Sequence, residues 1–211
     1  MLSILQAAGW PIWPLVACSI LALALVIERF ISLQTSKVAP PKLLAEVLIV
    51  SRSSVPVSDV VNQLEKNSAM GEVLASGLRS LGSNPRCSED ELRSCMESTG
   101  RLVAHRLEHY LNALATIASA APLMGLFGTV VGMIEIFGSQ APTGAGNPAQ
   151  LAHGISVALY NTAFGLIVAI PSLIFWRYFR ARVDEHLLTI ELASERLARH
   201  LNTLRKSTRM P

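Results

Sequence analysis

Three long apolar runs without any lysine or arginine most constrain what this chain can fold into. The runs cover Trp10 to Ile27, Leu111 to Phe137 and Ile155 to Trp176. Each is near the roughly 20 residues that an α-helix needs to cross ~30 Å of hydrocarbon. Only 16% of the 211 residues are charged, against about 25% in a soluble domain. The sequence therefore predicts an all-α integral membrane protein with three transmembrane helices.

The cationic residues predict how these helices are oriented. All eighteen lysines and arginines lie in two blocks, Arg29 to Arg106 and Arg177 to Arg209. Such residues are retained on the cytoplasmic side of a membrane when they lie near helix ends. We therefore expect an external N-terminus and a cytoplasmic C-terminus. The basic blocks are not interleaved with aromatic residues and match no nucleic-acid-binding module, so we expect no nucleic-acid partner.

The first run is interpreted as a span and not as a signal peptide, because residues 1–9 carry no positive charge and an arginine closes the run. The expected organisation is an external N-terminus (1–9), a first span (10–28), a cytoplasmic helical region (29–109), a second span (110–137), an external loop (138–153), a third span (154–176) and a cytoplasmic C-terminal helix (177–211). Ser88 followed by Glu91 is a capping-box pattern, which predicts the start of one long helix that continues into the second span.

The second and third spans differ from simple lipid-facing anchors. They carry small residues at helical spacing, notably Gly125, Gly128, Gly132 and Gly165. Small residues let membrane helices approach closely, so these two helices are expected to pack against protein.

Two segments resemble the MotA/TolQ/ExbB proton-channel family, and within it the TolQ/ExbB branch. They are residues 121–133 (APLMGLFGTVVGM) in the second span, and residues 155–166 (ISVALYNTAFGL) with 168–171 (VAIP) in the third. Together they cover about a third of the chain, and the order of helices around a large cytoplasmic region also fits. The flagellar stators of the family resemble a four-span design, which fits this chain less well.

The resemblance implies an oligomeric subunit in a bacterial inner membrane, a pentamer whose second and third helices line a pore. It implies a smaller partner similar to ExbD or TolR, with a membrane Asp that takes up and releases protons, and a TonB-like or TolA-like protein that receives the work. Thr129 and Thr162 match the two pore threonines that face this Asp. A carboxylate is costly to ionise in a dry pore, and a hydroxyl can accept from its acid form and donate to its charged form. The alternative is that each threonine bonds its own helix backbone.

One position departs from the family pattern. The family commonly has Glu in the third span where this chain has Val157, whereas Glu135 is the acid deep in a span here. We hypothesise that Glu135 replaces the missing carboxylate in the external half of the proton path; the alternative is a hydrated carboxylate at the interface. Asn161 is polar within the span and is expected to line the pore or to pack between helices.

Two further readings stay open. His105, Glu108 and His109 fit the H-x-x-E-H pattern of inverted zinc proteases, but no third ligand is evident, so a solvated helix face is the ordinary interpretation. A structural membrane scaffold is the other alternative. The sequence predicts no enzyme activity, metal or cofactor, and it does not separate an ExbB-like role from a TolQ-like role in envelope integrity. The arginines after the third span are suited to anionic lipid headgroups.

Overall fold

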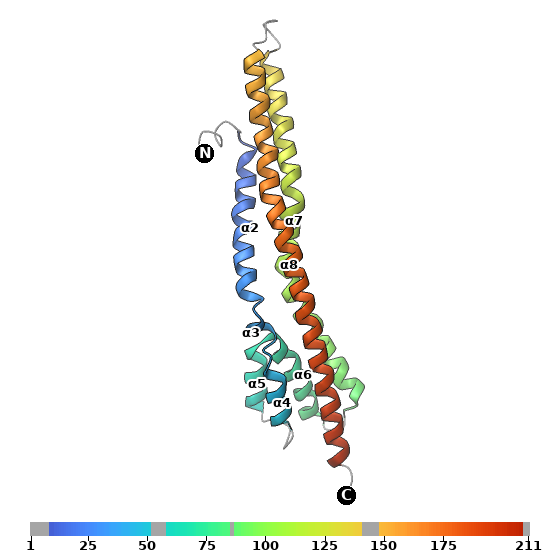
Figure 1. Ribbon diagram of the computed structural model, residues 1–211. Coiled ribbons are helices and arrows are strands. Elements are labelled where there is room, and N and C mark those ends of the chain that lie inside the picture. The colour runs from blue at the N-terminus through green and yellow to red at the C-terminus, as the bar shows by residue number, and fades with distance from the viewer. Residues whose placement is uncertain (1–8, 52–57, 85–86, 141–147, 209–211) are drawn as a thin grey trace. The chain divides into compact units, whose positions relative to one another are not determined.

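A computed structural model describes residues 9–51, 58–84, 87–140 and 148–208. All regular elements in these ranges are α-helices (Figure 1), which confirms the expected all-α class. The helices are α2 (Ile12–Ser32), α3 (Thr35–Val38), α4 (Leu43–Val50), α5 (Ser58–Asn67), α6 (Ala69–Ser83), α7 (Glu89–Gln140) and α8 (Pro148–Thr208).

Three of these helices, α2, α7 and α8, are long and apolar enough to cross a membrane. They contain nearly all residues of the three apolar runs, so the predicted number of candidate spans is confirmed for the described residues. The two longer helices continue well beyond their apolar parts, because nothing in their polar continuations breaks the helical pattern.

The start of α7 follows from local side-chain chemistry. The Ser88 Oγ accepts a hydrogen bond of 3.1 Å from the Glu91 backbone N–H, and the Ser88 N–H donates to the Glu91 carboxylate at 2.8 Å. This reciprocal pair is the predicted capping box, and it satisfies two donors that the first helical turn leaves without backbone partners.

The expected external loop at 138–153 stays a prediction, because helices α7 and α8 can extend beyond the membrane. α7 continues to Gln140 and α8 already begins at Pro148, so much of that segment is helical, and residues 141–147 lie outside the described ranges. The physical reason at the second end is that proline is well suited to the first turn of a helix, where its missing N–H has no partner to lose.

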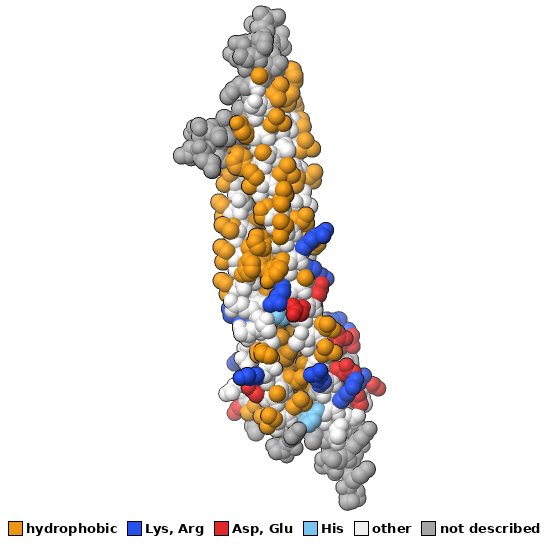
Figure 2. Space-filling model, viewed as in Figure 1, with side chains coloured by type: hydrophobic (Ala, Val, Ile, Leu, Met, Phe, Trp, Pro, Cys, Tyr) orange, Lys and Arg blue, Asp and Glu red, His pale blue; other side chains and the backbone are white. Residues whose placement is uncertain are grey.

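The chain forms two compact units, and α7 and α8 run through both. The first unit comprises residues 1–29 and 110–178. In it, α2 packs against α7 and α8 around a small core of Leu15, Ala121, Val168 and Ala169. Many large apolar side chains of this unit are exposed, and Figure 2 shows orange side chains along the whole length of its visible face. An apolar surface of this extent indicates contact with lipid or with other protein chains.

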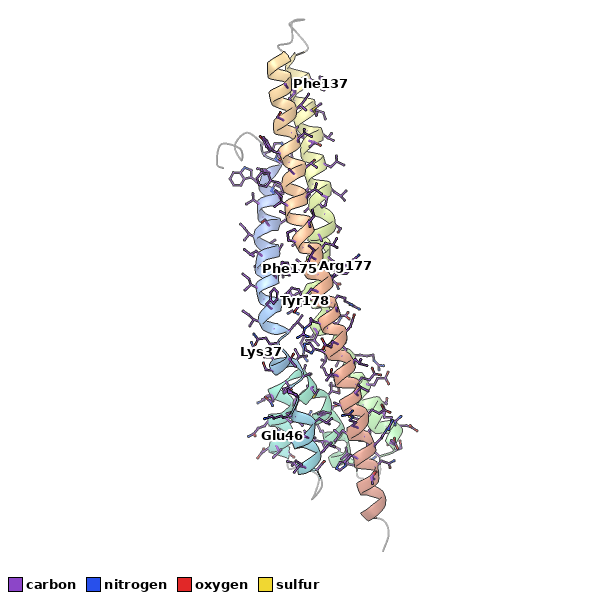
Figure 3. The ribbon with its side chains drawn as sticks, viewed as in Figure 1. Lys37, Glu46, Phe137, Phe175, Arg177 and Tyr178 are labelled. Atoms are coloured by element: carbon purple, nitrogen blue, oxygen red, sulfur yellow. The ribbon has the colours of Figure 1, made fainter. Side chains whose placement is uncertain are left out.

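Polar anchors mark one end of the first unit. Arg29 is buried, pairs with Glu28 through two contacts of 2.5 and 2.8 Å, and lies with its guanidinium 4.8 Å from the centre of the Tyr110 ring. Figure 3 shows Arg177 and Tyr178 at the same end of the unit and Phe137 at the other end. A charged end of this kind fits the boundary of a membrane span.

The second unit comprises residues 30–109 and 179–211. Its core is built mainly from α6, α7 and α8; the largest fully buried side chains include Leu74, Leu78, Met96, Val103 and Leu197. Ion pairs surround this core. One of them joins Arg79 to Glu65 at 2.5 Å, and the hydrogen bonds and charge of this guanidinium lower the pKa of the Glu65 carboxyl.

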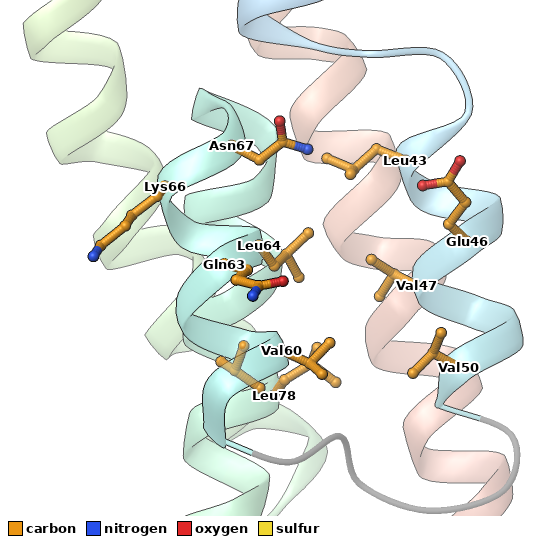
Figure 4. A pocket seen from close by; sticks show the side chains of 11 residues that line it. Leu43, Glu46, Val47, Val50, Val60, Gln63, Leu64, Lys66, Asn67 and Leu78 are labelled. Atoms are coloured by element: carbon orange, nitrogen blue, oxygen red, sulfur yellow. The ribbon is translucent and has the colours of Figure 1, made fainter.

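A groove of about 490 Å³ opens in the second unit between α4 and α5 (Figure 4), and Leu43, Val47 and Leu64 line its apolar part. Glu46 and Lys66 lie at its edge. Helix α4 is apolar on nearly all sides, and its Ile49 and Val50 are exposed.

Candidate functional site

The contact between α7 and α8 in the first unit is unusually close, and we call it the α7–α8 seam. A Cβ atom at Gly125 would lie 2.7 Å from the Asn161 carbonyl oxygen and 3.1 Å from the Thr162 Cα. A Cβ atom at Gly165 would lie 2.6 Å from the Ala121 carbonyl oxygen. Because these neighbours are backbone atoms that cannot move aside, the two helices approach to a distance that only glycine permits.

The seam fixes which residues lie level with one another. Five pairs face each other across it: Ala121 with Gly165, Gly125 with Thr162, Gly128 with Asn161, Gly132 with Ala158, and Ile136 with Gly154. On α7 these positions repeat every three or four residues, so they form one stripe along the helix. The four glycines singled out from the sequence all lie in this stripe or opposite it.

The seam also separates two flanks of the α7–α8 pair. At 100° per residue, Thr129 lies about 60° to one side of the stripe on α7, and Thr162 lies about 60° to one side of the stripe on α8. Since the helices are antiparallel, these offsets bring both threonines to the same flank. Helix α2 packs on the opposite flank, where Trp10 contacts Phe127 and Leu15 packs near Phe164. We call these the threonine flank and the α2 flank.

The Thr129 hydroxyl is half-buried and donates a 2.6 Å hydrogen bond to the Leu126 carbonyl oxygen of its own helix. This is the backbone-bonded geometry that the sequence left as an alternative, and it leaves the hydroxyl lone pairs as acceptors. A hollow of about 560 Å³ opens beside it, lined by Thr129, Met133 and Phe137 among others. Thr129 is therefore reachable from outside the α7–α8 pair.

Asn161 lies in the seam itself and on neither flank. It is 1% exposed, and its Cβ, Cγ and Nδ2 atoms lie 2.8, 2.9 and 3.0 Å from the position of a Cβ at Gly128. Of the two roles expected for Asn161, this geometry favours packing between helices. Thr162 follows directly and is half-buried at the edge of the seam.

Glu135 lies on the α2 flank, about 60° from the stripe and therefore about 120° from Thr129 around α7. Its side chain is exposed. By the pairs on either side of it, Glu135 is level with Ile155. It therefore lies about 3 Å from the level of Val157 and about 9 Å from the level of Thr129, in both cases toward the C-terminal end of α7. Direct contact between the Glu135 carboxylate and the Thr129 hydroxyl of the same chain does not occur.

The H-x-x-E-H segment of α7 has a different arrangement from a metal centre. The rings of His105 and His109 lie edge to face with centroids 6.4 Å apart, and the Glu108 carboxylate pairs with Arg180 at 3.0 Å. Among the residues that the structure describes, no group of three His, Cys, Asp or Glu side chains could hold a metal ion. The segment is an exposed helix face with an ion pair to α8.

Comparison with known proteins decides the family. Residues 65–192, which contain both spans of the seam, match the MotA/TolQ/ExbB proton channel family. This chain belongs to that family. The members of this family are non-enzymatic transport proteins. The prediction that this chain is not an enzyme is therefore confirmed.

Two relatives cover most of the chain. A biopolymer transport protein of Synechocystis named ExbB-like 3 is 32% identical over 202 residues, which are 90% of this chain and 93% of that one. The biopolymer transport protein exbB1 of Vibrio cholerae is 30% identical over 168 residues, 79% of this chain and 73% of that one. The ExbB of Aquifex aeolicus is 43% identical over 81 residues, 38% of this chain and 55% of that one. The chain is thus a family member similar to ExbB proteins.

Ala121, Gly154 and Ala158 complete the seam, and they are small residues of the kind that the sequence predicts to pack against protein. Sequence reasoning missed the cluster of Arg29, Glu28 and Tyr110, because a cation near a helix end indicates topology and gives no sign of its partner on another helix.

Proposed function

We propose that this chain is a proton-conducting subunit of a bacterial inner-membrane complex that uses the proton-motive force to energise TonB-dependent transport across the outer membrane. The observation that carries the proposal is the position of Thr129 and Thr162 on one flank of the α7–α8 pair, opposite α2. Family membership and the biopolymer-transport names of the relatives support it.

In the proposed assembly, five copies turn their threonine flanks toward a central pore and α2 toward lipid. A single-span partner similar to ExbD or TolR supplies a membrane Asp inside the pore. The two hydroxyls then face that carboxyl group. They accept a hydrogen bond from its protonated form, and after rotation they donate to its ionised form, so the cost of charging it in a dry pore falls.

The proposed orientation places the N-terminus in the periplasm and the second unit in the cytoplasm. It rests on the two cationic blocks, which flank the spans on one side only. A TonB-like protein would take up the work, and anionic lipids would bind the arginines that follow the third span.

The proposal is tested by reconstituting the chain with its single-span partner in liposomes and following proton uptake under an imposed membrane potential. Uptake should require both chains and should cease when the partner's membrane Asp is replaced by Asn. Partner-independent uptake of equal rate, or no uptake from an intact complex, would contradict the proposal.

The role proposed for Glu135 is to hold protons at the external mouth of the path, linked to Thr129 through water or through a neighbouring copy. Its exposure supports this role. Because Glu135 lies on the α2 flank of its own chain, the link to Thr129 must cross to another flank through one of these two routes. We expect Glu135→Gln to abolish proton uptake at unchanged assembly, because the amide keeps the size of the side chain and removes the titrating group. Uptake at the wild-type rate would show instead a hydrated interfacial carboxylate.

A TolQ-like role in envelope integrity is the second candidate, since the two branches share the seam motifs. The ExbB names of the relatives favour the first. Expression of the chain and its partner in strains that lack one system or the other separates them. Restored siderophore-dependent growth supports the ExbB-like role, and restored detergent resistance alone supports the TolQ-like role.

A further inference from the structure

The α7–α8 seam buries a polar side chain that no apolar packing requires. Asn161 is 1% exposed within a span whose neighbours are mainly apolar, and it lies against Gly128. A buried amide in a membrane helix is costly unless the surrounding protein offers it hydrogen-bond partners. Side chains of this type commonly join one membrane helix to another.

Two glycines one turn apart on α7 leave the space that Asn161 occupies. Gly128 leaves space for the amide, and Gly125 leaves space for the carbonyl oxygen of Asn161 and the Cα of Thr162. Asn161 takes part in both contacts, and Thr162 takes part in the second. The α7–α8 seam thus contacts residues 161 and 162 at two successive turns of α7, and a rotation of α8 at this level would move the Asn161 amide away from Gly128.

We propose that Asn161 is a positioning residue for Thr162. With its amide seated against Gly128, it fixes the rotation of α8 on α7, and this rotation turns the adjacent Thr162 to the flank where Thr129 lies. Asn161 itself does not take part in proton transfer in this proposal. The expected effect on proton flux rests on the proposed function. The rotation of α8 can be measured independently of that function.

The rotation is tested in the assembled complex by the accessibility of single cysteines. In a background with Cys18, Cys87 and Cys95 replaced by serine, Thr162→Cys and Ala163→Cys report on the threonine flank and on the exposed outer side of α8. Their ratio of reaction rates with a water-soluble maleimide is compared with and without Asn161→Ala. We expect Asn161→Ala to lower this ratio, the rate at Thr162→Cys divided by the rate at Ala163→Cys, at least threefold.

Tyr160→Ala is the matched control, because Tyr160 is the exposed neighbour of Asn161 and loses a larger side chain. It should leave the ratio unchanged. An unchanged ratio in Asn161→Ala, or an equal fall in Tyr160→Ala, overturns the proposal. Should Asn161→Ala fail to assemble, Asn161→Ser provides the same comparison.

Proton flux gives the second readout. In the otherwise native chain, Asn161→Ala should lower the flux about as much as Thr162→Val, and adding it to Thr162→Val should lower the flux no further, because both changes remove the same hydroxyl from the path. Additive losses overturn the positioning role. If Thr162→Val has no effect on flux, the proposed function fails, while the cysteine ratio still decides whether Asn161 sets the rotation.

Discussion

Gly165→Ala is expected to separate α7 from α8 and to prevent the protein from forming a stable, conducting complex. The added Cβ would lie 2.6 Å from the Ala121 carbonyl oxygen and 3.1 Å from the Gly125 Cα. Both are backbone atoms of the facing helix, so the clash can be relieved only by moving the helices apart. Overpacking of this kind costs about 1–3 kcal/mol, and the displacement also removes the contacts of the whole stripe.

The measurement is the thermal unfolding midpoint of the purified protein, together with the fraction that assembles with the partner. Gly138→Ala is the control, because Gly138 lies on the same helix as the seam. Apart from the local backbone of α7, no described part of the protein lies within 4 Å of the Cβ that this change would add. We expect Gly138→Ala to behave as the wild type. An unfolding midpoint and an assembled fraction unchanged in Gly165→Ala would show that the seam is not as close as described.

Replacing both threonines of the threonine flank with valine is expected to lower proton flux about a hundredfold while the complex stays assembled. Valine keeps the shape of threonine and removes the hydroxyl. A hydrogen bond to a charged group contributes about 1.5–3 kcal/mol, and about 1.4 kcal/mol of barrier is a factor of ten in rate. Thr129→Val and Thr162→Val should therefore each lower flux about tenfold.

Thr129→Ser and Thr162→Ser should keep most of the flux, because serine retains the hydroxyl. Thr116→Val is the matched control on α7, where the exposed Thr116 hydroxyl donates to the Asn112 carbonyl oxygen at 2.8 Å. It should leave the flux unchanged. If Thr116→Val lowers flux as strongly as Thr129→Val, the effect comes from the helix backbone and the hydroxyls of the threonine flank have no special role.

These experiments depend on features that the sequence predicts to very different extents. The start of α7 was predictable because Ser88 and Glu91 act on backbone groups within one turn. The start of α8 at Pro148 was harder to predict, because glycine, serine and proline favour loops on average, while proline also suits the first turn of a helix. The glycines of the seam were recognisable by their spacing, since small residues at one helical stripe have few other uses in a span.

The roles of the polar residues were not predictable in the same way. The spacing of His105, Glu108 and His109 matched a metal motif, yet Glu108 pairs with Arg180 from a distant part of the chain. For Asn161, the sequence left open whether it lines a pore or packs between helices, and its contact with Gly128 depends on the register of two helices. The distance between Thr129 and Glu135 along α7 follows from the helical rise per residue. That distance does not say which neighbouring helix each side chain faces.

By itself, the sequence determined the class of this protein, its three candidate spans and the helices that pack closely. Length, hydropathy and the spacing of small residues are properties of each segment alone, so they can be read without knowing how two segments pack together. Only the tertiary structure decided that Thr129 and Thr162 share a flank, that Asn161 is buried in the seam and that Glu135 lies on the side of α2. Which way a side chain faces is set by the register and rotation of one helix against another, and these are fixed by contacts between residues far apart in the chain.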